Sequence, residues 1–546
     1  MANFQVVIFL MAILIGLSAV ADKIRLPYPI LLVLVGLIIG FVPFLPDLAM
    51  DPDVVFLVFL PPLLYNAAAK TSWHEFRKSL RPISTLAITL VFFTTTAIAV
   101  AAHYYIPGFS WPLAFLLGAI VSPPDAVAAA SITKGLGLSR RVTTILEGES
   151  LVNDASALIA YRYALVAVST GSFVLWKAGL QFFWVAGGGI LIGVLAGYCF
   201  VFIHKRINNN ATVETSLTLL APFVVYLAAE RLHVSGVLAV VSTGLVMSWR
   251  APEIFSSETR MRTRVVWDSI IFLLDGIVFI LIGLQLPDIV KDIKGYSPGQ
   301  VIGYGLIISA VAIVVRLVWV FTSAYWLNLF SIRRHKGNGG ESTRRTNLPW
   351  RNVLIVGWTG TRGVLSLATA MALPLTLDNG SPFPYRHLIL FIAFVVIFVT
   401  LVVQGLTLPP LIRLLGVKPR NDERKEEMEL QLLMADCTLD YINHHLAVDI
   451  APELKEQLTR RQLHAVARFK KGIEDLKNAP DNGDASAILP VHQIVSAQKE
   501  IIRFQRQLLL TLHHKGSFGD EAIRKMEREL DIEDLRLHVQ QEKGPV

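Results

Sequence analysis

The sequence predicts an all-α polytopic membrane protein with about 13 transmembrane helices, inverted repeats and two broken helices, followed by a cytoplasmic helical C-terminal tail. The 546-residue chain is 53% hydrophobic and only 17% charged, and its apolar runs can cross a hydrocarbon layer of roughly 30 Å. After about Lys418 helical periodicity replaces continuous apolarity, and the last 129 residues contain 20 Lys and Arg against 23 Asp and Glu. We therefore expect a transmembrane domain over residues 1–417 and a tail over 418–546.

The apolar runs give the order of the transmembrane helices. The candidate spans cover residues 4–21, 28–45, 53–69, 80–106, 112–137, 141–169, 173–204, 211–232, 233–249, 264–286, 298–331, 350–377 and 385–414. Alternate loops between them carry 21 Lys and Arg, whereas the intervening loops carry 5. Because basic residues in short loops stay in the cytoplasm, the N-terminus is predicted outside and the C-terminus inside. The formal charge of +8 is thus mostly topological, so we expect membrane lipid and no nucleic acid as a partner.

The tail contains a turn signal, Pro480-Asp-Asn-Gly-Asp484, which predicts two helical parts over about 421–479 and 490–542. Each part has apolar residues at three- and four-residue spacing, which is typical of a packing surface. We expect this surface to serve self-association or docking on the membrane domain, with ligand sensing as the alternative.

The fifth span is predicted to break at Ser122-Pro123-Pro124-Asp125. Two consecutive prolines remove two backbone donors and leave the carbonyl groups near Ala119 and Ile120 without helical partners. Asp125 then lies at or near the start of a second half-helix, where the positive end of the helix dipole stabilises a carboxylate.

The twelfth span is predicted to break over Gly357–Gly363, where glycines recur every third residue beside the permanently charged Arg362. Irregular backbone at membrane depth is tolerated only where it is buried in protein or lines a watery cavity. Either break alone is compatible with a simple kink. Because the breaks lie seven spans apart, spans 1–6 and 8–13 are predicted to be inverted halves, a pattern that marks a transporter's midplane site.

The sixth span carries three carboxylates within Glu147-Gly-Glu149-Ser150-Leu-Val-Asn153-Asp154. An acid inside a transmembrane helix is a functional-site hypothesis, because only a cavity, a partner or an ion offsets its desolvation. Ser150 and Asp154 are separated by about 40° around the helix axis and share a face, whereas Glu149 is about 140° from Asp154. We therefore expect Glu149 to form a structural ion pair with Arg362.

Asp125, Asp154 and Ser150 provide hard oxygen ligands suited to a small hard cation. A buried carboxyl group favours its protonated form, whereas a bound cation favours the carboxylate, so one aspartate holds a proton or a metal ion but hardly both. This competition is already a coupling mechanism. No His or Cys cluster accompanies the acids, and we expect no cofactor beyond a transported cation and proton.

Four motifs in this order resemble the monovalent cation:proton antiporter family, which includes NhaP-type bacterial exchangers and eukaryotic sodium/hydrogen exchangers. The resemblance covers about residues 1–415, and its motifs are Phe59–Leu64, Ser122–Ala128, Glu147–Asp154 and Gly360–Val364. It implies a dimeric fold in which a core bundle moves relative to a dimerisation bundle. It matches the ion-binding aspartates to Asp154 and Asp125, and the structural pair to Glu149 and Arg362. Asn153 matches an asparagine that such antiporters associate with electroneutral exchange.

Three positions depart from that family pattern. Pro124 stands where threonine is usual, which removes a hydroxyl but keeps a backbone carbonyl as a possible ion ligand. Asn66 replaces an acid that often follows the third-helix motif. Asp275 lies where asparagine is commoner, and it either pairs with Arg316 or supplies a second titrating group.

We therefore predict a transporter and not an enzyme: an electroneutral sodium/proton antiporter of a bacterial inner membrane, working by alternating access in pH and sodium homeostasis, and forming a homodimer. The residues that carry exchange are Asp154, Asp125 and Asn153, with Ser150 and Pro124 as further ion ligands. The nearest alternative is potassium/proton exchange. A cation channel and an intramembrane aspartyl protease are the alternatives from other classes.

Overall fold

The computed structural model describes residues 2–24, 27–41, 55–133, 138–171, 175–207, 210–291, 297–334, 349–377, 380–416, 421–445, 452–478, 489–514, 526, 530, 533 and 534. The chain divides into two compact units, Met1–Pro419 and Arg420–Val546, each of which is considered by itself. Within these ranges the fold is helical, and the only β pairing is an isolated bridge between Thr376 and Pro382.

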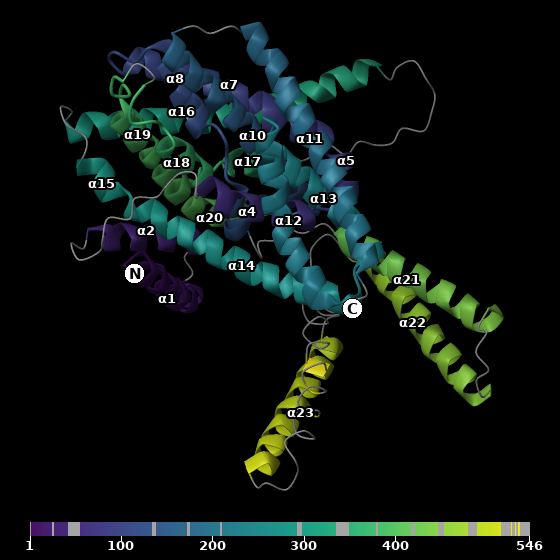
Figure 1. Ribbon diagram of the computed structural model, residues 1–546. Coiled ribbons are helices and arrows are strands. Elements are labelled where there is room, and N and C mark those ends of the chain that lie inside the picture. Colours follow the sequence, from purple (N-terminus) through teal and green to yellow (C-terminus); the bar gives the residue numbers. More distant parts are fainter. Residues whose placement is uncertain are drawn as a thin grey trace. The chain divides into compact units, whose positions relative to one another are not determined.

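The first unit is a bundle of long and short helices (Figure 1). They are α1 (Ala2–Ile24), α2 (Tyr28–Gly40), η1 (Val55–Phe59), α4 (Leu60–Lys70), α5 (Trp73–Lys78), α6 (Leu80–Ser84), η2 (Thr85–Leu90), α7 (Val91–Tyr105), α8 (Trp111–Val121), α9 (Ala126–Thr133), α10 (Arg140–Thr170), α11 (Leu175–Arg206), α12 (Ala211–Arg231), α13 (Gly236–Ile254), α14 (Ser257–Leu284), α15 (Leu286–Lys291), α16 (Pro298–Arg334), α17 (Trp350–Trp358), α18 (Val364–Met371), α19 (Arg386–Val399), η3 (Thr400–Gln404) and α20 (Gly405–Leu415). The segments η1, η2 and η3 are π-helical and join their neighbours without a loop.

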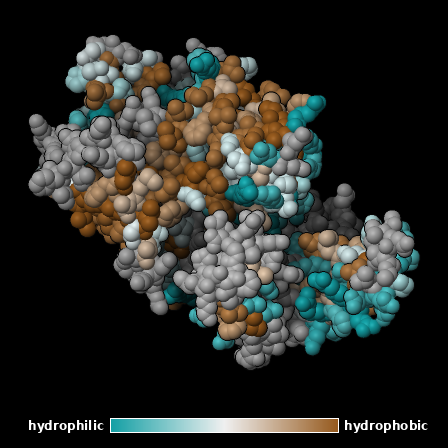
Figure 2. All heavy atoms as spheres, turned by 60° about the horizontal axis from the view of Figure 1, so that its bottom comes forward, coloured by the Kyte–Doolittle hydropathy of each residue, from teal (hydrophilic) through white to brown (hydrophobic). Residues whose placement is uncertain are grey.

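Every predicted span overlaps a helix or a continuous series of helical pieces. Seven helices in the described ranges are long and apolar enough to cross a membrane, and shorter apolar helices accompany them. Much of the visible surface of this unit is hydrophobic (Figure 2), as expected for a protein that faces lipid. The number of crossings stays a prediction.

Polar residues fix where several of these helices begin. Asn210 caps α12, because its Oδ1 atom accepts hydrogen bonds from the backbone N–H groups of Thr212 and Val213, both at 3.2 Å. Ser235 caps α13 in the same way, and Ser256 caps α14. Side-chain capping of this kind satisfies donors that have no partner within the helix.

Helices α2 and α14 pack closely through a reciprocal pair of glycines. A Cβ atom on Gly36 would collide with the carbonyl oxygen of Ile280, and one on Gly283 would collide with that of Val33. Helix α14 also contacts α1, α4 and α12. Helices α2, α4 and α14 contribute lining residues to the cavity described below.

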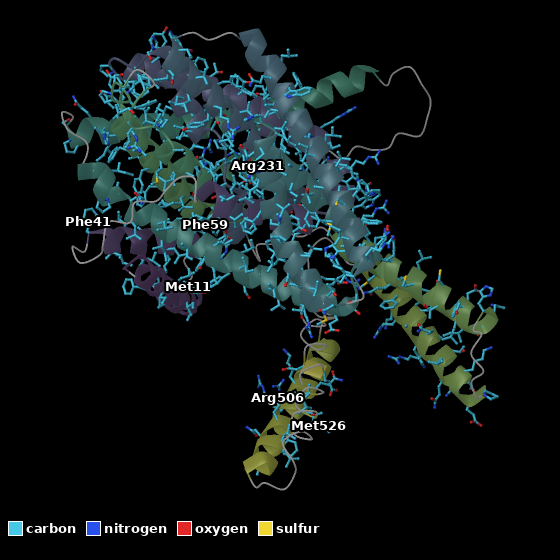
Figure 3. The ribbon with its side chains drawn as sticks, in the orientation of Figure 1. Met11, Phe41, Phe59, Arg231, Arg506 and Met526 are labelled. Carbon is cyan, nitrogen blue, oxygen red and sulfur yellow. The ribbon has the colours of Figure 1, made fainter. Side chains whose placement is uncertain are left out.

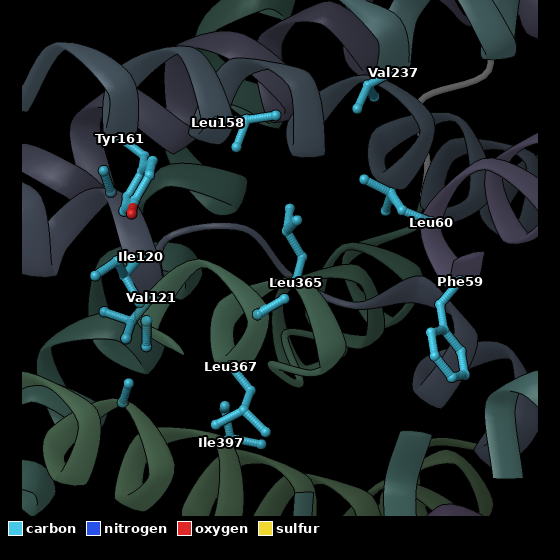
Figure 4. Close-up of a cluster of buried hydrophobic side chains, with 14 of the residues drawn as sticks. Phe59, Leu60, Ile120, Val121, Leu158, Tyr161, Val237, Leu365, Leu367 and Ile397 are labelled. Atoms are coloured by element: carbon cyan, nitrogen blue, oxygen red, sulfur yellow. The ribbon is translucent and has the colours of Figure 1, made fainter. Parts of the chain in front are cut away.

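The core of the unit surrounds the interrupted helices. Figure 4 shows Ile120 and Val121 of α8, Leu365 and Leu367 of α18, and Leu158 of α10 among its buried side chains. Tight apolar packing on these sides holds the polar segments between the half-helices in place.

The second unit contains three described helices, α21 (Asn421–His444), α22 (Pro452–Asn478) and α23 (Leu489–His514). The predicted part 421–479 is thus a pair of helices, α21 and α22, that pack against each other and bury apolar side chains such as Ile442 and Ile473. Their visible outer surface is largely hydrophilic (Figure 2). Arg506 of α23, which is labelled in Figure 3, forms an ion pair with Asp534 at 3.1 Å. The turn predicted at 480–484 lies outside the described residues.

Candidate ion-binding site

Both predicted helix breaks are confirmed. Helix α8 ends at Val121 and α9 begins at Ala126, so Asp125 directly precedes the second half-helix. Helix α17 ends at Trp358 and α18 begins at Val364. One carbonyl predicted to lose its helical partner, that of Ala119, accepts a hydrogen bond from the hydroxyl of Ser122 at 3.3 Å.

The two interrupted segments bind each other directly. The backbone N–H of Asp125 donates to the carbonyl oxygen of Thr361 at 2.6 Å, and the Thr361 hydroxyl donates to the carbonyl oxygen of Asp125 at 3.2 Å. Gly363 permits this approach, because the position of its missing Cβ atom is taken by the carboxylate of Asp125. Asp125 is therefore held by backbone from a segment more than two hundred residues away.

Arg362 also links the two interrupted segments. Its Nε donates to the carbonyl oxygen of Val121 at 3.0 Å, and its Nη1 donates to that of Gly360. Its backbone N–H donates to the hydroxyl of Thr400 at 3.0 Å. The guanidinium group thus supplies donors to carbonyl groups that the helix breaks expose.

The predicted ion pair between Glu149 and Arg362 is wrong. Glu149 instead accepts two hydrogen bonds from Arg316 of α16, at 2.5 Å from Nη1 and 2.8 Å from Nη2, and both side chains are only 2% exposed. Arg316 Nη2 also donates to the carbonyl oxygen of Val356 at 3.1 Å. The helical phase correctly turned Glu149 away from Asp154, but it could not choose between two buried arginines. The pairing also excludes the alternative in which Arg316 binds Asp275.

A cavity of about 920 Å³ lies beside the first helix break. Its polar lining residues are Tyr28, Asn66, Lys70, Asp125, Ser131, Thr133, Thr143, Glu147, Ser150, Asp154, Asp268, Asp275 and Ser366. The structure therefore brings Asp125, Ser150 and Asp154 to one cavity, as the sequence analysis predicts. Two carboxylates and a hydroxyl are hard oxygen donors that fit a small hard cation.

Asn153 and Pro124 orient the site from behind. The Asn153 amide Nδ2 donates to the carbonyl oxygen of Pro124 at 3.0 Å, and Asn153 is fully buried. Its Oδ1 atom is buried and has no hydrogen-bond partner among the described residues. The carbonyl group predicted as an ion ligand is thus already oriented by the helix that carries Asp154.

The charges in the cavity are unbalanced. Five carboxylates line it, against one lysine among the described lining residues, so its field favours cations. Lys70 forms an ion pair with Asp268 at 2.6 Å, and because these side chains are 54% and 53% exposed, the cavity opens beside them. This opening beside Lys70 and Asp268, the mouth of the cavity, was not predicted from the sequence. A signal was present, because Asp268 and Asp275 stand seven residues apart and thus share a helix face, as do Glu147 and Asp154.

Comparison with known proteins gives one consistent result. The family model for the transmembrane sodium/hydrogen exchanger matches residues 8–414. The chain is 30% identical over 538 residues to the uncharacterized Na⁺/H⁺ exchanger Rv2287 of Mycobacterium tuberculosis, covering 97% of this chain and 96% of that protein. It is 34% identical over 393 residues to a sodium, potassium, lithium and rubidium/H⁺ antiporter of Bacillus pumilus, covering 70% of this chain and 57% of that one.

A solved structure supports the fold. The sodium proton antiporter MjNhaP1 from Methanocaldococcus jannaschii, determined at pH 8, superposes with a TM-score of 0.60 at 19% sequence identity. The match covers 76% of this chain and all of that one.

Proposed function

Because the chain belongs to the sodium/hydrogen exchanger family, whose members are membrane antiporters, we propose that it exchanges one sodium ion for one proton by alternating access, with Asp154 as the shared carrier. The observation that carries this proposal is the cavity in which Asp154, Ser150 and Asp125 meet beside an interrupted helix. In the bacterial inner membrane such exchange would serve pH and sodium homeostasis.

The coupling follows from the chemistry of Asp154. When a proton occupies its carboxyl group, the cation loses a charged ligand, and a bound cation in turn disfavours protonation. Asp125, held against Gly363, supplies the second carboxylate, and Ser150 supplies a neutral oxygen on the same face of α10 as Asp154. One cation and one proton thus compete for the same place and move in opposite directions.

Electroneutral exchange is the form of transport that we propose. Asn153 is adjacent to Asp154 and adds no charge, and its amide is engaged with the Pro124 carbonyl. A one-for-one exchange of Na⁺ and H⁺ then leaves the net charge of the loaded site unchanged.

The mouth at Lys70 and Asp268 is proposed to face the cytoplasm. Both residues border loops, 70–81 and 250–264, that belong to the set carrying 21 of the 26 Lys and Arg in the loops, and such basic residues stay on the cytoplasmic side. The arrangement described here then corresponds to an inward-open state.

Potassium/proton exchange is the second candidate. Pro124 and Asn66 both line the cavity at places where the family pattern has other ligands, and a Bacillus pumilus relative is named for transport of sodium, potassium, lithium and rubidium. The two candidates differ only in the cation, and a flux assay with each cation separates them.

The test is sodium- and potassium-dependent proton movement in proteoliposomes at several pH values, with the membrane potential clamped. Wild type is expected to exchange independently of the potential, and Asp154→Asn is expected to lose exchange to background while remaining folded. Glu258→Gln is the matched control, because Glu258 lies 64% exposed on α14 and its one ion pair within the described ranges is with Arg262, one helical turn away. Robust pH-dependent exchange by Asp154→Asn would refute the carrier role, and potential-dependent exchange by wild type would refute electroneutrality.

A further inference from the structure

Asp275 is an acid near the middle of α14 that the exchange mechanism above does not use. It lines the same cavity as Asp154, and no hydrogen bond or ion pair links its carboxylate to another residue in the described ranges. An acid at this depth is costly unless a cavity, a partner or an ion compensates it. Because the described residues supply no partner for Asp275, water or an ion in the cavity must compensate its charge.

The hydroxyl of Tyr28 is a second polar group in the same part of the molecule, because Tyr28 of α2 lines the same cavity. Its oxygen is buried without a hydrogen-bond partner among the described residues, and it lies only 2.6 Å from the position that a Cβ atom on Gly276 would occupy. Its ring stacks on Phe272 of α14, with centroids 5.6 Å apart. A hydroxyl from α2 and a carboxylate from α14 therefore border one cavity, on two helices that pack tightly through the glycine pair Gly36 and Gly283.

A further polar group without a partner faces the same space. Asn66 of α4 lines the cavity at 8% exposure, and within the described ranges its amide makes no hydrogen bond. Uncompensated polar atoms of this kind are rare in the interior of folded proteins, except where water or an ion satisfies them. Asp275, Tyr28 and Asn66 together give this side of the cavity a polar surface.

The acids lie along one face of each of two helices, from the mouth of the cavity inwards. On α14, Asp268 at the mouth and Asp275 are seven residues, or about 10 Å, apart along one face. On α10, Glu147 and Asp154 have the same spacing. Asp154 of α10 and Asp275 of α14 both line the cavity, so they border the same space from different helices. No three such acids converge on a single metal position in the described part of the chain, which keeps the two places distinct.

We propose that Asp275 and Tyr28 form a second binding station for the transported monovalent cation, on the α2 and α14 side of the cavity, and that this station sets the apparent affinity for the cation. This inference rests on the proposed exchange function. The station concentrates cations that enter past Asp268 and delivers them to Asp154. It carries no proton of the exchange cycle, so it affects the concentration dependence of transport and not its stoichiometry.

The test measures the sodium concentration for half-maximal exchange in proteoliposomes. Asp275→Asn is expected to raise this concentration roughly tenfold, because it removes one of the five carboxylates whose charges favour cations in the cavity, while the maximal rate stays close to wild type. Tyr28→Phe removes only the hydroxyl and is expected to cause a smaller rise. Asp275→Glu should restore part of the affinity, which a purely structural role would not predict.

Glu258→Gln again serves as the control, since it removes one carboxylate from the same helix outside the cavity. An unchanged half-maximal concentration in Asp275→Asn would overturn the second station. If that variant does not fold, an unchanged value in Tyr28→Phe would overturn it instead. Loss of maximal rate without a change in sodium dependence would assign Asp275 a structural role. Failure of the wild type to exchange would refute the proposed function itself.

Discussion

The buried pair of Glu149 and Arg316 offers the sharpest test of how the core is held together. Both side chains are 2% exposed and joined by two hydrogen bonds, so solvent screens neither charge. Removing one member of such a pair leaves an uncompensated buried charge, at a cost of about 3–5 kcal/mol in unfolding free energy.

The structure also predicts which single substitution, Glu149→Ala or Arg316→Ala, lowers the unfolding free energy more. Gly360 lies between the guanidinium groups of Arg316 and Arg362, so Glu149→Ala leaves two buried cations facing each other. Arg316→Ala instead leaves Glu149 within the field of Arg362, and a carboxylate can become neutral by taking up a proton, which a guanidinium cannot. We expect a loss near 5 kcal/mol for Glu149→Ala and near 3 kcal/mol for Arg316→Ala.

The assay is equilibrium unfolding of the purified protein in mixed dodecyl maltoside and SDS micelles, followed by tryptophan fluorescence. The double variant Glu149→Ala/Arg316→Ala should lose less than the sum of the single variants, because no unpaired charge remains at that place. Glu253→Ala is the control, since its pair with Arg250 is 2.7 Å long but half exposed, and it should change stability little.

Two results would refute this reasoning. An unfolding free energy of Glu149→Ala within about 1 kcal/mol of wild type would show that the pair is not a structural support. A smaller loss for Glu149→Ala than for Arg316→Ala would show that repulsion between the two arginines does not govern the site. A stable but inactive Glu149→Ala protein would move Glu149 into the transport mechanism.

Further predictions concern the contacts that orient the aspartates. Gly363→Ala places a methyl group where the Asp125 carboxylate lies and should lower sodium-dependent proton movement by about tenfold or more. Gly299→Ala is the control, because a methyl group there meets open space and should leave the rate unchanged. Equal rates in the two variants would refute the contact between Gly363 and Asp125. Asn153→Ala removes the amide that binds the Pro124 carbonyl and should lower the unfolding free energy by about 1–3 kcal/mol in the micelle assay, and an unchanged value would show that another donor replaces it.

The helix breaks could be predicted from local sequence, because their causes are local. Prolines at 123 and 124 remove donors wherever the chain is placed, and the structure ends α8 at Val121 and starts α9 at Ala126 as expected. The shared face of Ser150 and Asp154 likewise follows from helix geometry alone, and both residues line the cavity.

The partner of Glu149 could not be predicted in this way. The choice between Arg316 and Arg362 depends on how α16 crosses α10. It also depends on which arginine donates hydrogen bonds to the carbonyl groups exposed at the helix breaks, and residue spacing encodes neither. Arg362 is used by Val121 and Gly360, which leaves Arg316 for the glutamate. The π-helical segments η1, η2 and η3 also left no signal in the apolar pattern.

The distance in sequence between Glu149 and Arg316 has a consequence for biosynthesis. The two residues are 167 positions apart, so α10 leaves the ribosome long before α16 exists. At bacterial elongation rates this interval lasts on the order of 10 to 30 s, during which the glutamate has no Arg316 to bind. The nascent chain must therefore shelter that acid, in the insertion machinery or against earlier helices, until the second half of the protein arrives. A chain that ends before Arg316 lacks the partner of Glu149 and cannot form this buried pair.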